Sequence, residues 1–447
     1  MPLSQAAQVL DARQLGADVT FTGISTDTRT LSRGNLFVAL TGPNFNGHDY
    51  LEQARERGAA AAAVTEVTTD SLPLLQVDDT RMALGQLAAW WRAQFAIPVL
   101  AVTGSNGKTT VKEMLAAILS GCGETLVTKG NFNNDIGLPL TLFGLNAEHR
   151  YAVVELGANH PGEIATLTGI AQPTVALVNN AGPAHLEGFG DLSGVAQAKG
   201  ELFANASPDT VCIINSDDHY AGLWRTLAAP RRIISFGMNA GAEVRAGWQG
   251  DIDGSDLRLV TPVGSVELRL ALPGQHNVMN ALAATAAALA IDIPLEKIAA
   301  GLAAVQPVHG RWESVPGRKG IRLVDDTYNA NPVSLGVALE LLSRSADETW
   351  LVLGDMGELG NASLRLHRQV GEEAREAGVS RLFALGELAA QAAQAFGDGA
   401  ECFSDIDSLN ARLLDEAHAG VVVLVKGSRA MRMERVVEAL RDSGGLH

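Results

Sequence analysis

The sequence predicts an α/β protein of three domains, and three observations lead to that prediction. The chain has 447 residues, which is enough for about three domains of ordinary size. Short apolar runs that suit buried parallel strands alternate with helical stretches along most of the chain. Hydrophobic residues make up 47% and charged residues 19%, a balance that allows a sizeable core in each domain.

The first domain is expected at residues 1–80 as a small α/β unit. Its apolar runs predict strands, and one amphipathic stretch predicts a helix. The strands are expected at 35–40, 59–65 and 74–77, and the helix at 49–57. Asp79 and Thr80 suit the cap of a further helix that runs through Leu84, Leu87 and Trp91. The first boundary is therefore placed there.

The second domain is expected at 81–309 and the third at 310–447. The second begins with a strand at 97–103 that leads into a glycine-containing turn. Strands of a parallel sheet are predicted from the apolar runs at 151–156, 174–178 and 211–214. An antiparallel excursion is expected at 240–272, and an Ala-rich helix at 277–290. In the third domain, strand-like runs alternate with helices at 321–324, 350–353, 382–385 and 421–425. That alternation predicts a doubly wound sheet.

Charge and cysteine usage exclude several classes of protein. The net charge of −16 argues against a nucleic-acid or anionic-membrane partner, because such partners need clustered basic residues. Cys122, Cys212 and Cys402 lie far apart, which suits a reducing compartment rather than a disulfide framework. No signal peptide is visible, and the longest apolar run, 281–291, is too short to span a bilayer. We expect a cytoplasmic protein with no membrane span.

The strongest motif is a phosphate-binding loop. Its glycines allow the backbone N–H groups to face an anion, Lys108 adds a positive charge, and Thr109 or Thr110 offers a hydroxyl to Mg²⁺. A strict Walker motif has glycine where this chain has Val102. A tight strand-to-helix turn without a ligand is the lesser alternative. The sequence thus predicts ATP binding by Gly104, Ser105, Asn106, Gly107, Lys108, Thr109 and Thr110.

Beyond this loop, the chain resembles the Mur ligase family over essentially its whole length. Seven blocks carry the resemblance in order, at 103–110, 154–159, 179–185, 198–203, 274–281, 310–313 and 325–332. Three more favour the branch of the family that uses D-alanyl-D-alanine, at 131–137, 353–360 and 426–431. The Asp-Asn-Pro-Arg box of the branch that adds diaminopimelate is absent from the sequence.

The resemblance implies a domain for a UDP-sugar, a central ATPase domain and a Rossmann-like C-terminal domain that contacts the dipeptide and ATP. It implies that ATP converts the terminal carboxylate of UDP-N-acetylmuramoyl-tripeptide into an acyl phosphate, which the amine of D-alanyl-D-alanine attacks. ADP and phosphate are released, in peptidoglycan precursor synthesis. Two alternatives stay open: a ligase like folylpolyglutamate synthetase, and a nucleotide switch without catalysis. We expect a monomer that takes these small-molecule substrates.

The chemistry brings anions together, so the site needs cations, for which we expect Lys108 and two Mg²⁺ ions. Glu155 at a strand end is a suitable Mg²⁺ ligand, although a chance glutamate is equally compatible. A loop histidine such as His185 is more often solvated, and a helical lysine such as Lys199 is more often exposed and paired, here with Glu201. The resemblance instead assigns catalysis to Lys108, Lys199 and His185, with Lys199 N-carboxylated. It assigns metal binding to Thr109, Glu155, His185 and Lys199.

The remaining candidates bind ATP or the substrates. The resemblance gives Asn277 to adenine, and Arg311 and Asp326 to phosphate and ribose, while a helix cap explains Asn277 or Asn280 equally well. Asp325 is an adjacent candidate, and Tyr328 could stack on a base or pack. Two polar loops resemble the uridine diphosphate site, and an asparagine cluster could bind sugar or peptide amides or only form a turn. The substrate-binding candidates are Ser25, Thr26, Asp27, Arg29, Thr41, Asn44, His48, Asn131, Asn133 and Asn134.

Overall fold

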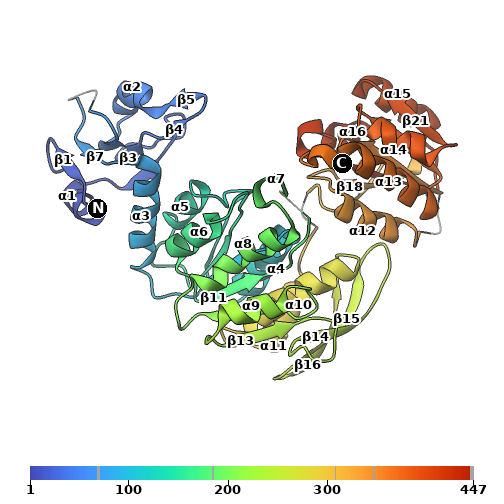
Figure 1. Ribbon diagram of the computed structural model, residues 1–447, viewed down its shortest axis with the longest axis horizontal. Coiled ribbons are helices and arrows are strands. Elements are labelled where there is room, and N and C mark those ends of the chain that lie inside the picture. Colours follow the sequence, from blue (N-terminus) through green and yellow to red (C-terminus); the bar gives the residue numbers. More distant parts are fainter. Residues whose placement is uncertain (68–70, 184–185, 308, 346–347, 443–447) are drawn as a thin grey trace.

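Three lobes follow one another in chain order in the computed structural model of the protein (Figure 1). The structure describes residues 1–67, 71–183, 186–307, 309–345 and 348–442. Each lobe is built around its own sheet, which confirms the predicted three-domain α/β architecture. The boundaries at 80 and 309 stay a prediction. Among the described residues, no helix is both long and apolar enough to traverse a bilayer.

The first lobe has a five-stranded sheet in the order β1-β7-β6-β3-β2, with β1 antiparallel to its neighbour. Its strands are β1 (Arg13–Leu15), β2 (Gly23–Ser25), β3 (Asn35–Val38), β6 (Ala61–Val64) and β7 (Leu74–Gln76). A small hairpin and three helices accompany the sheet. They are β4 (Thr41–Gly42), β5 (Phe45–Asn46), α1 (Leu3–Leu10), η1 (Gly47–Tyr50) and α2 (Leu51–Glu56). The predicted helix at 49–57 thus begins as a 3₁₀ turn, with the Asn46 side chain accepting from the backbone N–H of His48.

The central lobe has a six-stranded, all-parallel sheet in the order β13-β12-β11-β8-β10-β9. Its strands are β8 (Val99–Thr103), β9 (Thr125–Val127), β10 (Tyr151–Glu155), β11 (Val175–Val178), β12 (Val211–Asn215) and β13 (Ile233–Phe236). Alternate residues of β8 enter different cores, with Leu100 and Val102 on one face and Val99 and Ala101 on the other. Burial on both faces explains why this strand is an unbroken apolar run.

Helices cover both faces of the central sheet, and α4 and α10 pack together on one of them. The helices are α4 (Lys108–Ser120), α5 (Gly137–Leu142), α6 (Glu163–Ala171), α7 (Leu186–Phe189), α8 (Leu192–Ala204), α9 (Ala221–Ala228), α10 (Gln275–Leu289) and α11 (Leu295–Ala303). The predicted antiparallel excursion is confirmed as β14 (Arg245–Gly250), β15 (Ser255–Thr261) and β16 (Gly264–Leu270).

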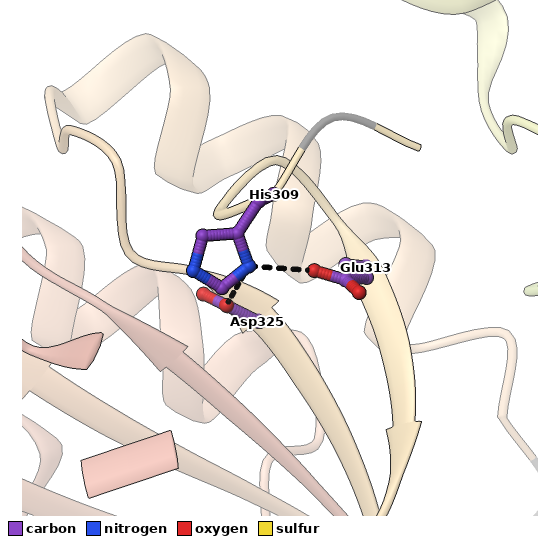
Figure 2. A group of neighbouring side chains, drawn as sticks. All are labelled: His309, Glu313 and Asp325. Carbon is purple, nitrogen blue, oxygen red and sulfur yellow. Dashed lines mark hydrogen bonds and ion pairs between the residues drawn. The ribbon is translucent and has the colours of Figure 1, made fainter. Parts of the chain in front are cut away.

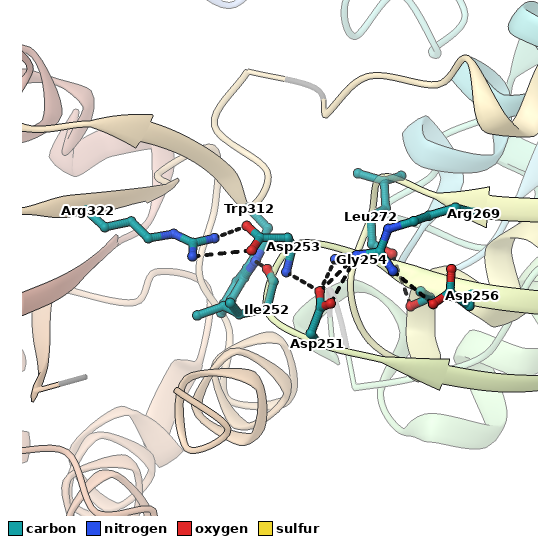
Figure 3. A network of polar contacts seen from close by, with 10 residues as sticks. Asp251, Ile252, Asp253, Gly254, Asp256, Arg269, Leu272, Trp312 and Arg322 are labelled. Carbon is teal, nitrogen blue, oxygen red and sulfur yellow. Dashed lines mark hydrogen bonds and ion pairs between the residues drawn. The ribbon is translucent and has the colours of Figure 1, made fainter. Parts of the chain in front are cut away.

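The turn between β14 and β15 reaches the third lobe (Figure 3). Asp251 closes the turn by accepting from the backbone N–H groups of Asp253 and Gly254 at 2.8 and 2.9 Å. The Trp312 indole N–H donates to the Ile252 carbonyl at 3.4 Å. Arg322 forms an ion pair with Asp253, so this turn connects the central lobe to the third.

The third lobe has a six-stranded sheet in the order β17-β18-β22-β19-β20-β21, in which only β17 runs antiparallel. Its strands are β17 (Glu313–Pro316), β18 (Arg322–Asp326), β19 (Glu348–Gly354), β20 (Arg381–Leu385), β21 (Ala400–Phe403) and β22 (Val421–Lys426). Its helices are η2 (Arg318–Gly320), α12 (Pro332–Leu342), η3 (Gly360–Ala362), α13 (Ser363–Glu376), α14 (Ala389–Phe396), α15 (Ile406–Glu416), η4 (Arg429–Met431) and α16 (Glu434–Leu440).

One helix, α3 (Thr80–Arg92), belongs to two cores at once. The Asp79 side chain caps it by accepting from the N–H groups of Arg81 and Met82, as the sequence predicts. Leu84 and Leu87 pack in the core of the first lobe, whereas Ala88 packs in the core of the central lobe. The helix therefore joins the two lobes through apolar contacts.

Candidate active site

The phosphate loop connects β8 to α4, and its backbone requires glycine. Gly104 has φ +148° and Gly107 has φ +78°, conformations that residues with a Cβ rarely adopt. A Cβ at Gly107 would lie 2.3 Å from Asn280 Oδ1 and 2.5 Å from Asn179 Nδ2. These two glycines let the loop turn closely against β11 and α10 and open the N-terminus of α4, where an anion is favoured.

Asparagines from two segments outside the loop hold it in place. Asn180 Oδ1 accepts from the backbone N–H of Asn106 at 2.9 Å, and Asn179 Nδ2 donates to the Asn106 carbonyl at 3.0 Å. The Asn179 side chain also donates to Asn280 at 2.9 Å. The Ser105 hydroxyl donates to the Gly182 carbonyl at 3.0 Å. Asn179 and Asn180 lie in a block quoted for the family resemblance, but sequence reasoning did not single them out.

Lys108 opens α4 and folds back over the loop. Its Nζ donates to the carbonyls of Gly104 at 2.8 Å and Ser105 at 3.2 Å, and its side chain is partly exposed. Desolvation lowers the pKa of Lys108, the carboxylate of Glu155 raises it, and Arg311 lowers it further. The ammonium group is thus held at the loop by two main-chain carbonyls.

Glu155 ends β10 beside the phosphate loop, at the carboxyl edge where open parallel sheets bind ligands. Its carboxylate is 3% exposed and accepts from Thr109 Oγ1 at 3.0 Å and from Asn133 Nδ2 at 2.8 Å. The structure therefore brings together two predicted metal-binding residues, Thr109 and Glu155. It also gives Asn133, a predicted substrate-binding residue, a direct contact with Glu155. Thr110, in the first turn of α4, is partly exposed.

Lys199 lies on α8 and is 2% exposed, so it is no surface lysine. Its Nζ lies 3.5 Å from the Ala158 carbonyl, three residues after Glu155, and 5.2 Å from the ring centroid of Phe189. Burial, followed by repulsion from Lys108, lowers the pKa of Lys199 from 10.5 to about 7. Glu201 caps α6 instead, accepting from the N–H of Gly162 at 2.7 Å.

Arg311 reaches from the third lobe into the central site. Its Nη2 donates to Thr109 Oγ1 at 3.2 Å, and its guanidinium lies 4.2 Å from the ring centroid of Tyr328. Its buried Nε has no acceptor in the described part of the chain. Asp326 pairs with Lys426 at 2.5 Å, across neighbouring strands whose register sets them opposite each other. Burial raises the pKa of Asp326, while Lys426 lowers it.

Asn277 lies in the first turn of α10 and is 6% exposed. It donates to the Pro273 carbonyl at 2.8 Å and accepts from Asn280 at 3.2 Å. The N-cap of α10 is Gly274 without a side-chain hydrogen bond, so neither asparagine caps the helix. Asn280 links Asn277 to the phosphate loop through Asn179.

The first-lobe candidates lie after β2 and β3, two neighbouring parallel strands, so both loops meet at one edge of the sheet. Asp27 pairs with Arg29 at 2.7 Å, and the Arg29 side chain is 84% exposed. His48 Nε2 accepts from the backbone N–H of Thr65 at 3.0 Å. The other first-lobe candidates are buried Ser25, half-buried Thr26, and exposed Thr41 and Asn44.

Two further predicted residues contribute to a local turn. Asn134 Oδ1 accepts from the N–H of Gly137 at 2.8 Å at the start of α5, and the Asn131 carbonyl accepts from the N–H of Asn133 at 2.7 Å. His185 lies outside the described residues. The sites of ATP and of the substrates are therefore predictions that rest on the contacts above.

The loop, the buried carboxylate and the arginine from a second lobe define a class, the ATP-dependent enzymes with a P-loop in an α/β domain. Three profiles match the chain: "Mur ligase family, catalytic domain" at residues 20–92, "Mur ligase middle domain" at 102–288 and "Mur ligase, glutamate ligase domain" at 310–429. The chain belongs to the Mur ligase family.

Relatives and solved structures support this family assignment. The chain is 45% identical to the UDP-N-acetylmuramoyl-tripeptide–D-alanyl-D-alanine ligase of Escherichia coli strain K12, over 99% of this chain and 98% of the relative. It is similar to MurF of Acinetobacter baumannii, with a TM-score of 0.91, 36% identity and 98% of each chain covered. It is also similar to the MurF ligase of Thermotoga maritima in complex with ADP, with a TM-score of 0.85 and 28% identity over 93% of this chain and 96% of that one.

Proposed function

We propose that this chain uses ATP to join D-alanyl-D-alanine to UDP-N-acetylmuramoyl-tripeptide, a step of peptidoglycan precursor synthesis. Its relatives over almost the full length carry that activity in their names. The observation that carries the proposal is the contact of Arg311 with Thr109, which brings a cation of the third lobe to the phosphate loop. Such a contact suits a ligase whose nucleotide and incoming amine meet between two domains.

The donor set around Glu155 fits Mg²⁺. The carboxylate and the Thr109 hydroxyl are hard oxygen ligands, which Mg²⁺ prefers, and Glu155 is too buried to serve as a surface charge. Thr109 and Glu155 would hold the ion, which would neutralise charge on the phosphates that react. His185 and a second ion belong to this proposal through the family resemblance.

Lys199 would complete the metal site in its carboxylated form. With a pKa of about 7, a large fraction of its amine is neutral near physiological pH. The neutral Nζ can form an N–C bond with CO₂ and lose a proton, which turns a cation into a carboxylate. An ammonium at this position would repel both Lys108 and a metal ion.

The described side chains divide the remaining work. Lys108 and the unpaired Nε of Arg311 would stabilise negative charge on the transferred phosphoryl group. Asn277 would orient the adenine, and Asp326 the ribose, close to Arg311. The loops around Arg29 and His48 would bind the uridine diphosphate, and Asn131 and Asn134 the sugar or peptide. We propose that the chain works as a monomer.

We also propose that the reaction takes place in the cytoplasm. Cys122, Cys212 and Cys402 are all free thiols, which supports a reducing compartment.

Phosphate release from ATP tests the proposal. We expect release only when both UDP-N-acetylmuramoyl-tripeptide and D-alanyl-D-alanine are present, together with one new amide bond for each phosphate. Release with a folate and glutamate would favour a ligase like folylpolyglutamate synthetase. Release without any acceptor would favour a nucleotide switch.

A further inference from the structure

Three side chains that the proposed reaction does not use converge at the base of the third lobe (Figure 2). Glu313 on β17 lies directly opposite Asp325 on β18 in the antiparallel register. Opposed residues of an antiparallel pair project from the same face, so both carboxylates point the same way. His309 precedes β17 and turns its ring toward them. One ligand atom from each residue lies within 4.8 Å of the others.

The spacing of these atoms matches that of ligands around a small cation. His309 Nδ1 is 2.9 Å from Glu313 Oε2 and 3.5 Å from Asp325 Oδ2. Nitrogen and oxygen ligands bound tetrahedrally to Zn²⁺ at about 2.1 Å lie about 3.4 Å apart. Small side-chain movements would therefore suffice to bind an ion among the three.

Asp325 gives an independent reason to expect a cation. It is 0% exposed, and its Oδ1 already accepts from the N–H and the hydroxyl of Thr327 at 3.1 and 2.6 Å. Its buried Oδ2 faces His309 and receives no hydrogen bond from the described residues. A buried carboxylate oxygen without a partner is costly, so a cation or a hydrogen-bond donor beside this atom would stabilise the fold. Arg441 is 3.8 Å from Glu313 Oε1, the oxygen that points away from the cluster.

We propose that His309, Glu313 and Asp325 bind one divalent transition-metal cation of the Zn²⁺ class. An imidazole with two carboxylates suits Zn²⁺ and its first-row neighbours, whereas Mg²⁺ prefers oxygen ligands alone. The His309 side chain is 71% exposed, which leaves room for water as a fourth ligand and for the ion to enter. The competing arrangement is a protonated His309 that pairs with both carboxylates and binds no metal.

The proposed metal site lies close in the chain to Arg311, a residue of the proposed ATP site. His309 is two residues before Arg311, and the Gly310 carbonyl between them accepts from the backbone N–H of Tyr328 at 3.0 Å. A bound ion would fasten this segment to β17 and β18. The main chain that carries Arg311 toward Thr109 would then be fixed at its root.

The test is a titration of the full-length protein with Co²⁺ alone, without nucleotide, followed by visible absorption and by competition with Zn²⁺. The variants are His309→Gln and Glu313→Gln, and His160→Gln is the matched control. His160 is also exposed and lies 3.2 Å from one carboxylate, that of Glu163, but among the described residues this pair has no third metal-ligating side chain beside it. Melting temperatures without metal verify that all variants are folded.

We expect the wild type and the His160→Gln variant to bind one more Co²⁺ than the His309→Gln and Glu313→Gln variants. If those variants retain the site, their affinity should fall at least about ten-fold, which corresponds to about 1.4 kcal/mol. Displacement of this Co²⁺ by Zn²⁺ should remove its absorption bands. Equal stoichiometry and affinity in all four proteins would overturn the proposal and leave His309 as an ion-pair partner only.

Discussion

The phosphate loop and the first-lobe loops differ in how fully their side chains are already engaged. Around the phosphate loop, Asn179 and Asn180 bond the Asn106 backbone through partly buried hydrogen bonds, and Asn280, from a distant segment, accepts a buried one from Asn179. In the first lobe, Arg29 is 84% exposed, and nearby Asp27 is its only ion-pair partner among the described residues. We propose that the ATP site is therefore built before its ligand arrives, whereas the uridine diphosphate site must exchange a local ion pair for its ligand.

This difference separates two kinds of contribution. Groups that are held in place without ligand cost no reorganisation during the reaction, so their loss should lower kcat. Groups that are exposed and mobile contribute mainly to binding, so their loss should raise KM. The following variants sharpen or break that distinction.

Lys108→Ala should give the largest effect. We expect kcat to fall about 10²-fold or more, because the phosphoryl group loses its principal cation. The side chain is partly exposed, so the melting temperature should change little. The control is Lys297→Ala, an exposed lysine on α11. An unchanged kcat for Lys108→Ala would remove the phosphate loop from the chemistry.

Lys199 variants should rank next. We expect Lys199→Ala and Lys199→Arg to lose most activity to the same extent, since arginine keeps the charge but cannot be carboxylated. Added small carboxylates should partly restore only the alanine variant. In the wild type with added bicarbonate, the carboxylated fraction of Lys199 should increase as pH rises through about 7, because the amine becomes neutral there. Full activity of the arginine variant would mean that Lys199 acts only as a cation.

The sequence predicts inner strands well and edge strands poorly. The expected runs correspond to the inner strands of all three main sheets, β20 beside the edge strand β21 included. The missed strands are the edge strands β1, β2, β9, β13, β17 and β21. Inner strands are buried along most of their length, and β8 and β11 along all of it, whereas β9 and β21 are largely half-exposed. An edge strand therefore lacks the unbroken apolar run on which the prediction depends.

The site shows the same limit. The phosphate loop is one contiguous motif, and the sequence predicts all of its residues. Other contacts of the proposed site join segments far apart in the chain, such as Asn133 with Glu155 and Lys426 with Asp326. Lys426 stands opposite Asp326 only through the pairing of β18 with β22. No local spacing contains that information.

Asn133→Ala tests whether the asparagine acts through Glu155. We expect kcat to fall about 10- to 100-fold, the usual cost of losing a group that orients a metal ligand. The apparent affinity for Mg²⁺ should fall with it. Asn146→Ala is the matched control, because Asn146 is an exposed asparagine of the central lobe that lies outside the proposed sites. A change in the KM of the UDP substrate alone would instead identify Asn133 as a substrate-binding residue.

Arg29→Ala should affect binding more than chemistry. We expect the KM of the UDP substrate to rise about ten-fold with kcat nearly unchanged, because a phosphate contact is present in both ground state and transition state. Arg55→Ala is the control, because Arg55 is also exposed and pairs with nearby Glu52. Steady-state kinetics with saturating ATP measure both parameters. A fall in kcat as large as the rise in KM would contradict the idea that exposed groups contribute mainly to binding.

Asp253→Asn should give the smallest effect and concerns the contact between lobes (Figure 3). Asp253 and Arg322 are 60% and 29% exposed, so their pair should contribute less than about 1 kcal/mol. Ligands that bridge the lobes favour a closed arrangement, and small-angle scattering should show a smaller radius with an ATP analogue and the UDP substrate. If the pair stabilises the unliganded arrangement, the Asp253→Asn variant should reach the closed arrangement at ligand concentrations lower than those of the wild type, by about five-fold at most. Asp256→Asn, which breaks a pair with Arg269 inside the central lobe, should titrate as the wild type does. Identical curves for both variants would assign the contact between lobes to Trp312 and Ile252 rather than to the ion pair.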